Sequence, residues 1–491
     1  MRATADHWQP RRKLVNKLLK KIKAALLLLR LRPFDTSTEA GRSKERLRRA
    51  AITTVSAGGA RAIAVLASLV TVPLTYHYLG AERYGLWMVL ISIIGMMSFA
   101  DLGIGNGLVN AVSEAYGRDD QKKATEYVTS AFVMMVGIAL ALAALGTIIY
   151  PFLPWMRLFN VKSAPVAAEG ASAFLILFFS FVVSIPLGVV SRAQAGLQQG
   201  YFPQIVGALG SVLTLLALLV VIAVHGSLGW LVFATTIGPT VGILLNARVL
   251  FREHPWLFPS RDAYSSSSAK RILKLGLMFF VLQCAFAVSY SSDNIVITQV
   301  LGAAAVAAYA VPQKLFSPVS TVVGMAVAPL WPAYGEAIAR GDVTWVRRVF
   351  RASLMLTLGL TIPICAFLAA AGPYILRTFF GKSLNVPISL LVVLAAWGVV
   401  NAVSTVISIL LNGAGVLRAQ VGIAIIASTI NLGLSIFLTR RVGIVGVCAG
   451  SLVSQVFITF PFDYLLIRQL FARLSIPQVE LCNSQNLLSQ Q

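Results

Sequence analysis

LGAERYGLWMVLISIIGMMSFADLGIGNGLVNAVSEAYGRDD, residues 79–120, is the stretch that decides the fold. It holds an apolar run at 85–111, and a helix needs roughly 20 apolar residues to cross a bilayer. Its LGA start recurs 222 residues later at 301–303, and its charged end EAYGRDD recurs at the same spacing as EAIARGD, residues 336–342. The stretch therefore predicts a membrane-spanning chain that contains an internal repeat.

The composition of the whole chain agrees with a bilayer environment. Hydrophobic residues make up 57% of the 491 residues, charged residues only 12%, and the mean hydropathy is +0.79. These values lie far from those of a soluble globular chain. The net charge of +23 resembles that of a nucleic-acid-binding protein, but most basic residues lie in the N-terminal segment and in alternate loops. We therefore attribute the charge to membrane topology and expect no nucleic-acid partner.

Apolar runs of spanning length recur along the chain and predict an all-α integral membrane protein of about twelve transmembrane helices. They lie near 54–77, 85–111, 126–153, 171–190, 203–224, 228–249, 273–299, 305–330, 347–370, 387–411, 419–439 and 444–466.

Basic residues predict the orientation, because loops on the cytoplasmic side retain Lys and Arg. If the N-terminus is cytoplasmic, the inner segments with their adjoining helix ends hold 32 of the 41 Lys and Arg residues, and the outer ones hold 7. Arg61 and Lys314 fall within spans. We therefore expect a multi-pass membrane protein with both termini in the cytoplasm.

The repeat divides the chain into two parallel halves of six helices. A second set of matches, with a spacing of 217 residues, pairs Gly196 with Gly413 and Gly229 with Gly446. Each half then enters from the cytoplasm, so the halves should be related by an axis along the membrane normal and should enclose a central cavity. The expected segments are an N-terminal segment (1–50), a first half (51–250), a linker (251–272), a second half (273–467) and a cytoplasmic tail (468–491).

The N-terminal segment, 1–50, carries fifteen basic residues. Its stretch RRKLVNKLLKKIKAALLLLRLR (11–32) has the composition of a basic amphipathic helix that lies on anionic lipid headgroups. A solvated disordered tail is the alternative, and an extension of the gene model is another.

Two cations within spans are the best candidates for contact with an anionic substrate, because a charge at bilayer depth is costly without partners or water. Lys314 lies about ten residues into its span, between Pro312 and Pro318, and should face a cavity or form a buried ion pair. Arg61 follows Gly58 and Gly59, which leave room either for a phosphate-bearing headgroup or for a neighbouring helix.

Two acids within spans are candidates for ion coupling or for a structural pair. Asp101 opens DLGIGNG, where alternating glycines should loosen the helix, and it could pair with Lys314 or Arg61. Asp293 should lie near the outer end of its helix, where water reaches.

The two related loops 114–120 and 336–342 should lie on the cytoplasmic face, where opposite charges can pair across the two halves when that side closes. Solvated loop helices are the alternative. Gln198, in the polar run 191–204, could line a vestibule on the same side. The candidate gate residues are Glu114, Arg118, Asp120, Glu336, Arg340 and Asp342.

Catalytic and metal-binding patterns are missing from the sequence. The four cysteines have no CxxC spacing, and the four histidines are scattered without a neighbouring ligand cluster. We therefore expect neither a metal nor a cofactor, and a transporter rather than an enzyme. A membrane polymerase or ligase should carry a large outer loop, whereas the longest outer connections here have about seventeen residues.

Residues 79–120 and their echo at 301–342 resemble the polysaccharide transporters of the multidrug/oligosaccharidyl-lipid/polysaccharide exporter superfamily, which include the Wzx-type O-antigen flippases. The likeness covers roughly 52–470. It implies a flippase that moves undecaprenyl-diphosphate-linked oligosaccharide, the repeat unit of O-antigen in lipopolysaccharide, of capsule or of exopolysaccharide, by alternating access. A proton or sodium gradient would drive it, and other polysaccharide-assembly proteins would be partners.

Two alternatives keep the same architecture. A MATE-like exporter of drugs or organic cations should place acidic and aromatic residues in its cavity, whereas Asp101 and Asp293 are here offset by Arg61 and Lys314. A lipid II flippase would use the same mechanism on another sugar.

Overall fold

The computed structural model describes residues 29–30, 32–96, 99–155, 164–380 and 386–475, and all regular structure in these ranges is helical. The predicted amphipathic helix at 11–32 lies outside them except for its last residues, and so does the tail beyond residue 475.

The first half consists of long helices joined by short turns. They are α2 (Glu39–Met96), α3 (Ile104–Gly117), α4 (Gln121–Ile149), η2 (Tyr150–Phe152), α6 (Ala164–Gly196), α7 (Tyr201–Ala223) and α8 (Leu228–Glu253). Two 3₁₀ turns, η3 (Pro255–Leu257) and η4 (Arg261–Ala263), lead to the second half. The connection predicted at 251–272 is thus shorter, because helices on both sides extend into it.

The second half repeats this plan. Its helices are α9 (Ser266–Leu301), α10 (Ala303–Val327), α11 (Leu330–Ala339), α12 (Val343–Phe380), α13 (Ile388–Gly413), α14 (Leu417–Val442), α15 (Val445–Ser454), the π-helical turn η6 (Gln455–Thr459) and α16 (Phe460–Leu474).

Eleven helices among the described residues are long and apolar enough to cross a membrane. The remaining predicted span, 85–111, is divided between the end of α2 and the start of α3. Leu102 and Gly103, with φ of 49° and 70°, interrupt the helix between them. The loosening predicted from the DLGIGNG glycines is confirmed as a break directly before α3.

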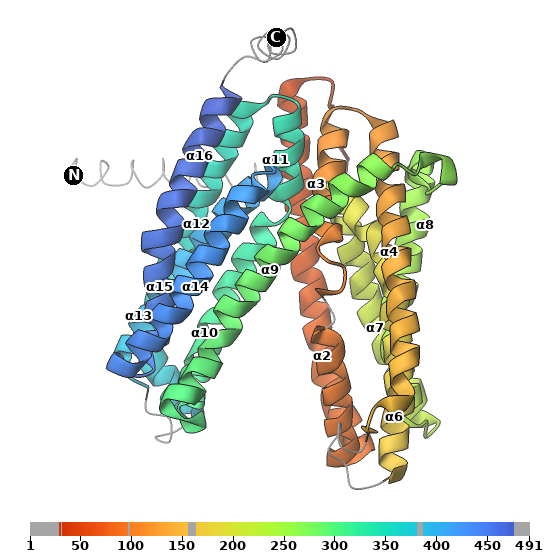
Figure 1. The fold of residues 1–491 in the computed structure, drawn as a ribbon, viewed down its shortest axis with the longest axis vertical. Helices are drawn as coiled ribbons and strands as arrows, with labels where there is room; N and C mark the ends of the chain where they lie inside the picture. The colour runs from red at the N-terminus through yellow and green to blue at the C-terminus, as the bar shows by residue number, and fades with distance from the viewer. Residues whose placement is uncertain (1–28, 31, 97–98, 156–163, 381–385, 476–491) are drawn as a thin grey trace, which may run out of the picture.

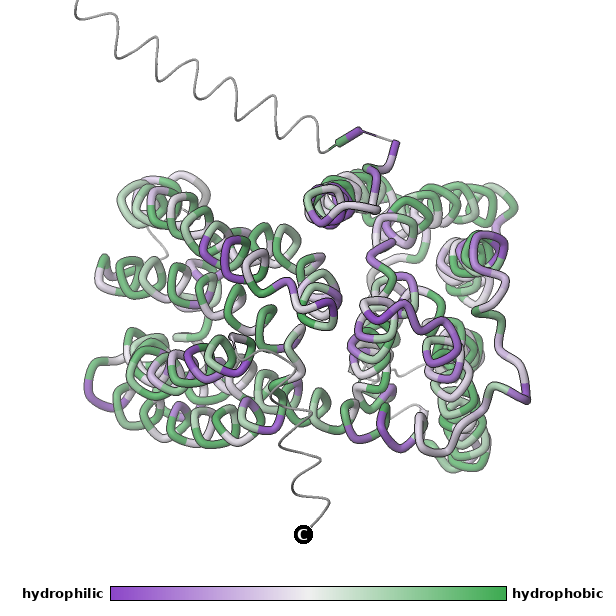
Figure 2. The backbone as a smooth tube through the Cα atoms, turned by 90° about the horizontal axis from the view of Figure 1, so that it is seen from above, coloured by the Kyte–Doolittle hydropathy of each residue, from purple (hydrophilic) through white to green (hydrophobic). Residues whose placement is uncertain are grey.

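The two halves meet at one end of the molecule and diverge toward the other (Figure 1). We call these the joined end, where α3 and α11 end, and the splayed end. Seen from the joined end, the halves stand side by side, with hydrophobic residues over much of their outer faces (Figure 2). α9 crosses from the first half at the joined end into the second half at the splayed end (Figure 1).

The matching helices α3 and α11 pack against each other at the joined end. A Cβ on Gly117 would lie 2.7 Å from the Cβ of Ala339, and a Cβ on Gly335 would lie 2.5 Å from the hydroxyl of Ser113. Small residues therefore allow the two backbones to approach closely, as at helix contacts in membranes.

The first helix begins earlier than the sequence predicted. α2 starts at Glu39, so part of the segment predicted as a cytoplasmic extension is helical. Glu45 forms ion pairs with Arg48 and Arg49 at i+3 and i+4, at 2.7 and 3.0 Å, which support this additional helix.

The apolar cores lie almost entirely within the halves. One buried cluster joins α3, α4 and α6 of the first half, and two others join helices of the second half. Among the described residues, Ile272 of α9 and Ala50 of α2 extend such a cluster across the boundary, and Leu47 of α2 packs against the second of these clusters. Each half is therefore a packed unit, and polar contacts hold much of the interface between them.

Candidate functional site

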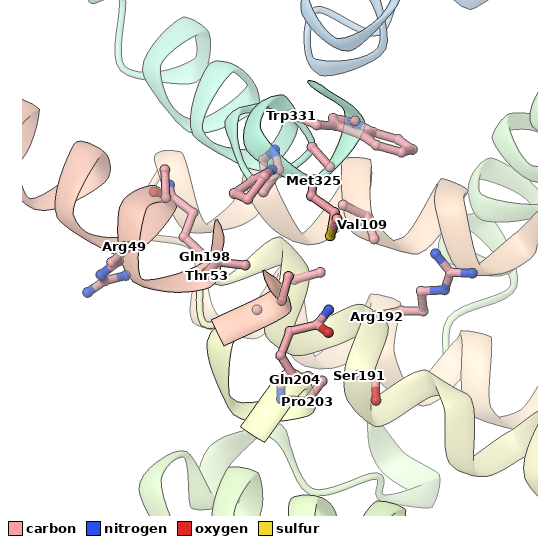
Figure 3. A pocket seen from close by; sticks show the side chains of 18 residues that line it. Arg49, Thr53, Val109, Ser191, Arg192, Gln198, Pro203, Gln204, Met325 and Trp331 are labelled. Carbon is pink, nitrogen blue, oxygen red and sulfur yellow. The ribbon is translucent and has the colours of Figure 1, made fainter. Parts of the chain in front are cut away.

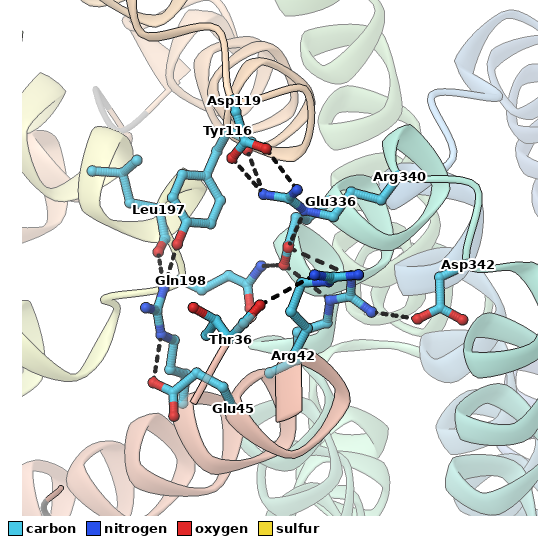
Figure 4. A network of polar contacts seen from close by, with 12 residues as sticks. Thr36, Arg42, Glu45, Tyr116, Asp119, Leu197, Gln198, Glu336, Arg340 and Asp342 are labelled. Carbon is cyan, nitrogen blue, oxygen red and sulfur yellow. Dashed lines mark hydrogen bonds and ion pairs between the residues drawn. The ribbon is translucent and has the colours of Figure 1, made fainter. Parts of the chain in front are cut away.

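A network of charged side chains fastens the two halves together at the joined end (Figure 4). Arg46, near the start of α2, donates from Nε to Glu336 of α11 at 3.0 Å and from Nη1 to Asp342 at 2.8 Å. All three side chains are at most 8% exposed. Removing one partner of such a buried ion pair strongly destabilises the folded protein, because the other charge stays buried without a partner.

A second contact joins the matching loops of the repeat. Arg340 pairs with Asp119 at 2.6 Å and with Glu336, one turn back on α11, at 2.8 Å. The hydrogen bond from Arg340 lowers the pKa of Asp119 below its usual range, and the same bond raises the pKa of Arg340. Both groups therefore stay charged at neutral pH.

Residues from the end of α6 complete the network. Gln198, in the left-handed region with φ of 60°, donates an amide hydrogen bond to Glu336. Arg49 donates to the carbonyl of Leu197 and to the hydroxyl of Tyr116, both at 3.1 Å. Polar groups of α2, α3, α6 and α11 thus seal this end.

The gate candidates divide into two groups. Glu336, Arg340 and Asp342 belong to the network, but their partners across the halves are Arg46, Gln198 and Asp119. The other three candidates lie beside the network: Glu114 pairs with Arg118 and Arg271, and Asp120 caps α4 by accepting from the amide of Lys123. Arg46 was missed because its partners are about 290 residues away in sequence.

A cavity of about 490 Å³ lies between the halves, next to the network (Figure 3). Arg49, Thr53 and Gln198 of the first half face Met325 and Trp331 of the second half across it. Its lining comes from α2, α3, α6, α7, α10 and α11, so a molecule bound there would contact both halves.

Arg192 of α6 supplies a cation to this cavity. Its guanidinium donates to the amide oxygen of Asn106 at 2.9 Å, and the side chain is otherwise exposed. An exposed guanidinium with a fixed orientation suits the oxygens of a phosphate group. Arg192 was not singled out from the sequence, because the polar run 191–204 was expected to follow the fourth span as a solvated turn, where basic residues are common, whereas the structure places Arg192 in α6.

Arg61 and Lys314 do not line this cavity, but each lies on a helix that does, nearer to the splayed end than the lining residues of that helix. Arg61 is one turn beyond Ala57, a residue that lines the cavity, so both lie within about 40° on α2. Lys314 is three turns before Met325 and within about 20° of it on α10. Both cations are exposed, and a Cβ on Gly58 or Gly59 would meet nothing within 4 Å. The glycines therefore leave open space and do not serve helix packing.

Asp101 forms an ion pair with neither cation. Its Oδ1 accepts a hydrogen bond from the amide of Gly103 at 2.9 Å, which fixes the turn before α3. A Cβ on Gly105 would lie 3.0 Å from Asp101 Oδ2 and 2.9 Å from Arg192 Nε, so these two side chains flank the glycine.

Asp293 is buried, and the expectation that water reaches it was wrong. It is 5% exposed, because α9 packs against α10 and α15 at this level. One oxygen accepts a hydrogen bond from the hydroxyl of Tyr309 at 2.8 Å, and the other has no hydrogen-bond partner among the described residues.

A second cavity, of about 560 Å³, lies within the second half. Its walls come mainly from α9, α13, α14, α15, η6 and α16. Phe99 and Asn106 of the first half and Trp331 of α11 complete the lining. Asp463 of α16 lines it and is 7% exposed. Asp463 was overlooked, although an ionisable residue within a predicted span was the signal used for Asp293.

Family models match most of the chain. The model described as polysaccharide biosynthesis protein matches residues 51–337, and the MatE model matches residues 279–437.

Individual relatives are distant in sequence. A Yersinia pseudotuberculosis protein whose name refers to O-antigen export is 21% identical over 379 residues, which are 75% of this chain and 84% of the relative. A Salmonella typhi protein whose name refers to O-antigen transport is 25% identical over 271 residues, 55% of this chain and 61% of the relative.

Solved structures of MATE transporters share the fold. MATE in its straight conformation superposes with a TM-score of 0.72 at 16% identity, covering 88% of this chain and 97% of the other. An outward-facing multidrug resistance MATE family transporter superposes with a TM-score of 0.71 at 18% identity, covering 87% and 96%. The superpositions extend over most of both chains, so this chain has the fold of these structures.

Proposed function

The chain belongs to the polysaccharide biosynthesis protein family of membrane exporters, and from this premise we propose that it is a flippase for lipid-linked oligosaccharide. The substrate class is an undecaprenyl-diphosphate-linked repeat unit of O-antigen, capsule or exopolysaccharide. It moves from the inner to the outer leaflet of the bacterial inner membrane, and both termini of the protein are cytoplasmic.

The geometry of the interface between the halves carries this proposal. The halves are separately packed, a polar network seals one end, and the helices diverge at the other. Alternating access needs two rigid halves with an interface that can open on either side. With the predicted orientation, the sealed end is cytoplasmic and the structure is open outward.

The charge of the space between the halves supports an anionic headgroup. Arg192 lines the cavity with an exposed cation, and Arg61 and Lys314 are exposed cations on α2 and α10, two of the helices that line it. A diphosphate that loses water inside a membrane protein needs such partners. Anionic headgroups near the basic N-terminal segment, and other polysaccharide-assembly proteins, are further partners of this proposal.

The driving force in this proposal is a proton or sodium gradient, with no cofactor, and Asp293 is its coupling group. Support comes from its burial and from its single hydrogen-bond partner, Tyr309. A buried carboxylate without a cation beside it is costly when charged, so binding a proton or a cation changes its energy strongly. Asp101 fits this role less well, because it shapes a turn.

Complementation of a strain that lacks its flippase tests the substrate class. Arg61→Ala and Lys314→Ala should each reduce surface glycan at unchanged membrane levels, and Arg61→Lys should keep most of it. Lys270→Ala, an exposed cation outside the cavities, is the control. Normal export by the double alanine variant would exclude the role of these cations. The wild-type chain should also prevent lipid-linked oligosaccharide from accumulating on the cytoplasmic side.

One observation favours a second candidate, a MATE-like exporter of organic cations. The cavity of the second half holds an acid, Asp463, together with Trp331, Phe279 and Phe286, which is the combination that binds such cations. Extrusion of ethidium from cells that carry this chain, without any rescue of glycan export, would support this candidate against the first.

A further inference from the structure

We propose that the cavity within the second half is a glycan-binding subsite, in which Asp463 accepts hydrogen bonds from sugar hydroxyls while the diphosphate lies at Arg192. This inference rests on the proposed function and adds the place and the chemistry of sugar recognition. It also expects a neutral or amino sugar near Asp463, because a carboxylate there repels an acidic one.

Amides and hydroxyls dominate the polar lining of this cavity. They include Asn106, Gln283, Ser404, Asn431, Ser451 and Gln455. Each of these groups can donate and accept hydrogen bonds, as sugar hydroxyls do. Lys and Arg are missing from the lining, so a phosphate has no charged partner here, whereas a polyhydroxylated ring has many.

Several of these polar groups are held in place by one another. Gln455 donates to the hydroxyl of Ser404 at 2.8 Å, and Asn431 accepts from Ser451 at 3.1 Å. The turn that carries Gln455 is π-helical, a local distortion often found at functional sites. The lining is thus prearranged, which reduces the ordering that a ligand has to impose.

Aromatic rings supply the apolar part of a sugar site. Phe279 and Trp331 contact each other with ring centroids 5.2 Å apart, and both line the cavity. The C–H face of a pyranose packs against such rings. The cavity volume of about 560 Å³ lies within the range of small-molecule sites and leaves room for more than one ring.

Asp463 is the group that points most strongly to a ligand. It lines the cavity, is 7% exposed, and has neither a hydrogen bond nor an ion pair among the described residues. A buried carboxylate without partners is destabilising. Two neighbouring hydroxyls of one sugar can donate to its two oxygens and satisfy both.

The two cavities adjoin each other, as the binding sites for the sugar and the diphosphate of one substrate must. Trp331 lines both of them, and Asn106 of the second cavity accepts the hydrogen bond of Arg192 in the first. A sugar in the second half is therefore next to a phosphate at Arg192. The lipid tail can remain between the diverging halves, on the apolar surfaces of α2 and α10.

Binding of defined lipids to the full chain in nanodiscs tests this division. The probes are undecaprenyl diphosphate, the same lipid carrying N-acetylglucosamine, and tetraphenylphosphonium. The wild-type chain should bind the glycosylated lipid at least tenfold more tightly than the bare one. Asp463→Leu and, independently, Gln283→Leu should remove most of that gain, while Asp262→Asn, the control on the exposed linker, should retain it. Arg192→Ala should weaken both lipids to a similar degree.

The outcomes separate this inference from the proposed function. Equal affinity for the two lipids, or a gain that survives both Asp463→Leu and Gln283→Leu in folded protein, would overturn the glycan subsite and leave the flippase assignment standing. Binding of tetraphenylphosphonium that is lost in Asp463→Asn, with neither lipid bound by the wild type, would overturn both in favour of an organic-cation exporter.

Discussion

Arg340 forms one ion pair within its own loop of the repeat and another with the matching loop of the first half. Its sequence counterpart Arg118 pairs with Glu114 as Arg340 pairs with Glu336, at 2.9 and 2.8 Å, so the two loops share a local design. Only Arg340 also reaches across the halves, to Asp119. The sequence could predict which loops face each other, but not which charges would meet.

The pair between Asp119 and Arg340 makes closure of the joined end depend on pH. Arg340 lowers the pKa of Asp119 below the ordinary 3.8, so the pair is intact above that range and is lost as the pH falls through the lowered value. Acidification to well below pH 3.8 should therefore weaken the closure of this end, and Asp119→Asn should reduce the response. Because Asp119 is largely exposed, we expect less than a tenfold change in population.

The opening of the joined end can be measured as the distance between two spin labels, at Lys122→Cys in the first half and Arg348→Cys in the second. The native cysteines of the chain are replaced for this experiment. If the distance distributions of Asp119→Asn and the parent change identically with pH, this pair does not contribute to closure.

Arg46 should matter more for stability than Arg340. Its loss leaves the buried carboxylate of Glu336 without a cation on α2, and breaking a buried pair costs about 3–5 kcal/mol. Arg46→Ala should lower the thermal unfolding temperature in detergent by several degrees, and adding Glu336→Gln should restore part of it. An additive loss in the double variant would contradict direct coupling between the two residues.

A substitution at Asp293 should remove coupling to the ion gradient without removing transport itself. In proteoliposomes, Asp293→Asn should abolish the stimulation by an imposed proton or sodium gradient but leave downhill exchange of substrate, because the amide cannot change its charge. Tyr309→Phe, which removes the hydrogen bond of 2.8 Å, should shift the pH at which stimulation is half-maximal. Full gradient-driven transport by Asp293→Asn would exclude this residue as the coupling group.

At the level of helices, glycines at the start of α3 allow α9 to cross it closely. A Cβ on Gly107 would lie 2.8 Å from the carbonyl oxygen of Ile272, and one on Gly103, with φ of 70°, would lie 2.3 Å from that of Gly276. The sequence indicated a loosened helix here but not the helix that uses the space.

Gly107→Ala should therefore lower the unfolding temperature and the yield of folded protein. Gly137→Ala is the matched control, since a Cβ there meets nothing within 4 Å and alanine favours a helix interior by about 1 kcal/mol. Size-exclusion profiles and thermal unfolding of both variants give the comparison. Equal behaviour of the two variants would contradict the close approach of α3 and α9.

Helix boundaries were predictable where hydrophobicity alone sets them and not where tertiary contacts do. The span near 228–249 corresponds to α8, Leu228–Glu253. By contrast, α2 begins at Glu39, because Glu45 and Arg46 find partners that only the folded chain provides.

The whole molecule divides as its repeat predicted, into two halves of related design. The functional asymmetry between them could not be predicted in this way. The cavity of the second half is lined by side chains from seven α-helices, and Asp463 on α16 reaches it directly after the π-helical turn η6. A search limited to ionisable residues finds Asp463 but not its surroundings.

In the proposed mechanism, the two halves rock against each other around a cationic cavity. Pulsed electron resonance on two label pairs tests it most directly: Lys122→Cys with Arg348→Cys at the joined end, and Thr147→Cys with Thr378→Cys at the splayed end, whose side chains are all exposed. When glycosylated undecaprenyl diphosphate is added, the joined-end distance should gain a longer population while the splayed-end distance shortens. Two distances that stay fixed, or that lengthen together, would contradict alternating access by rocking.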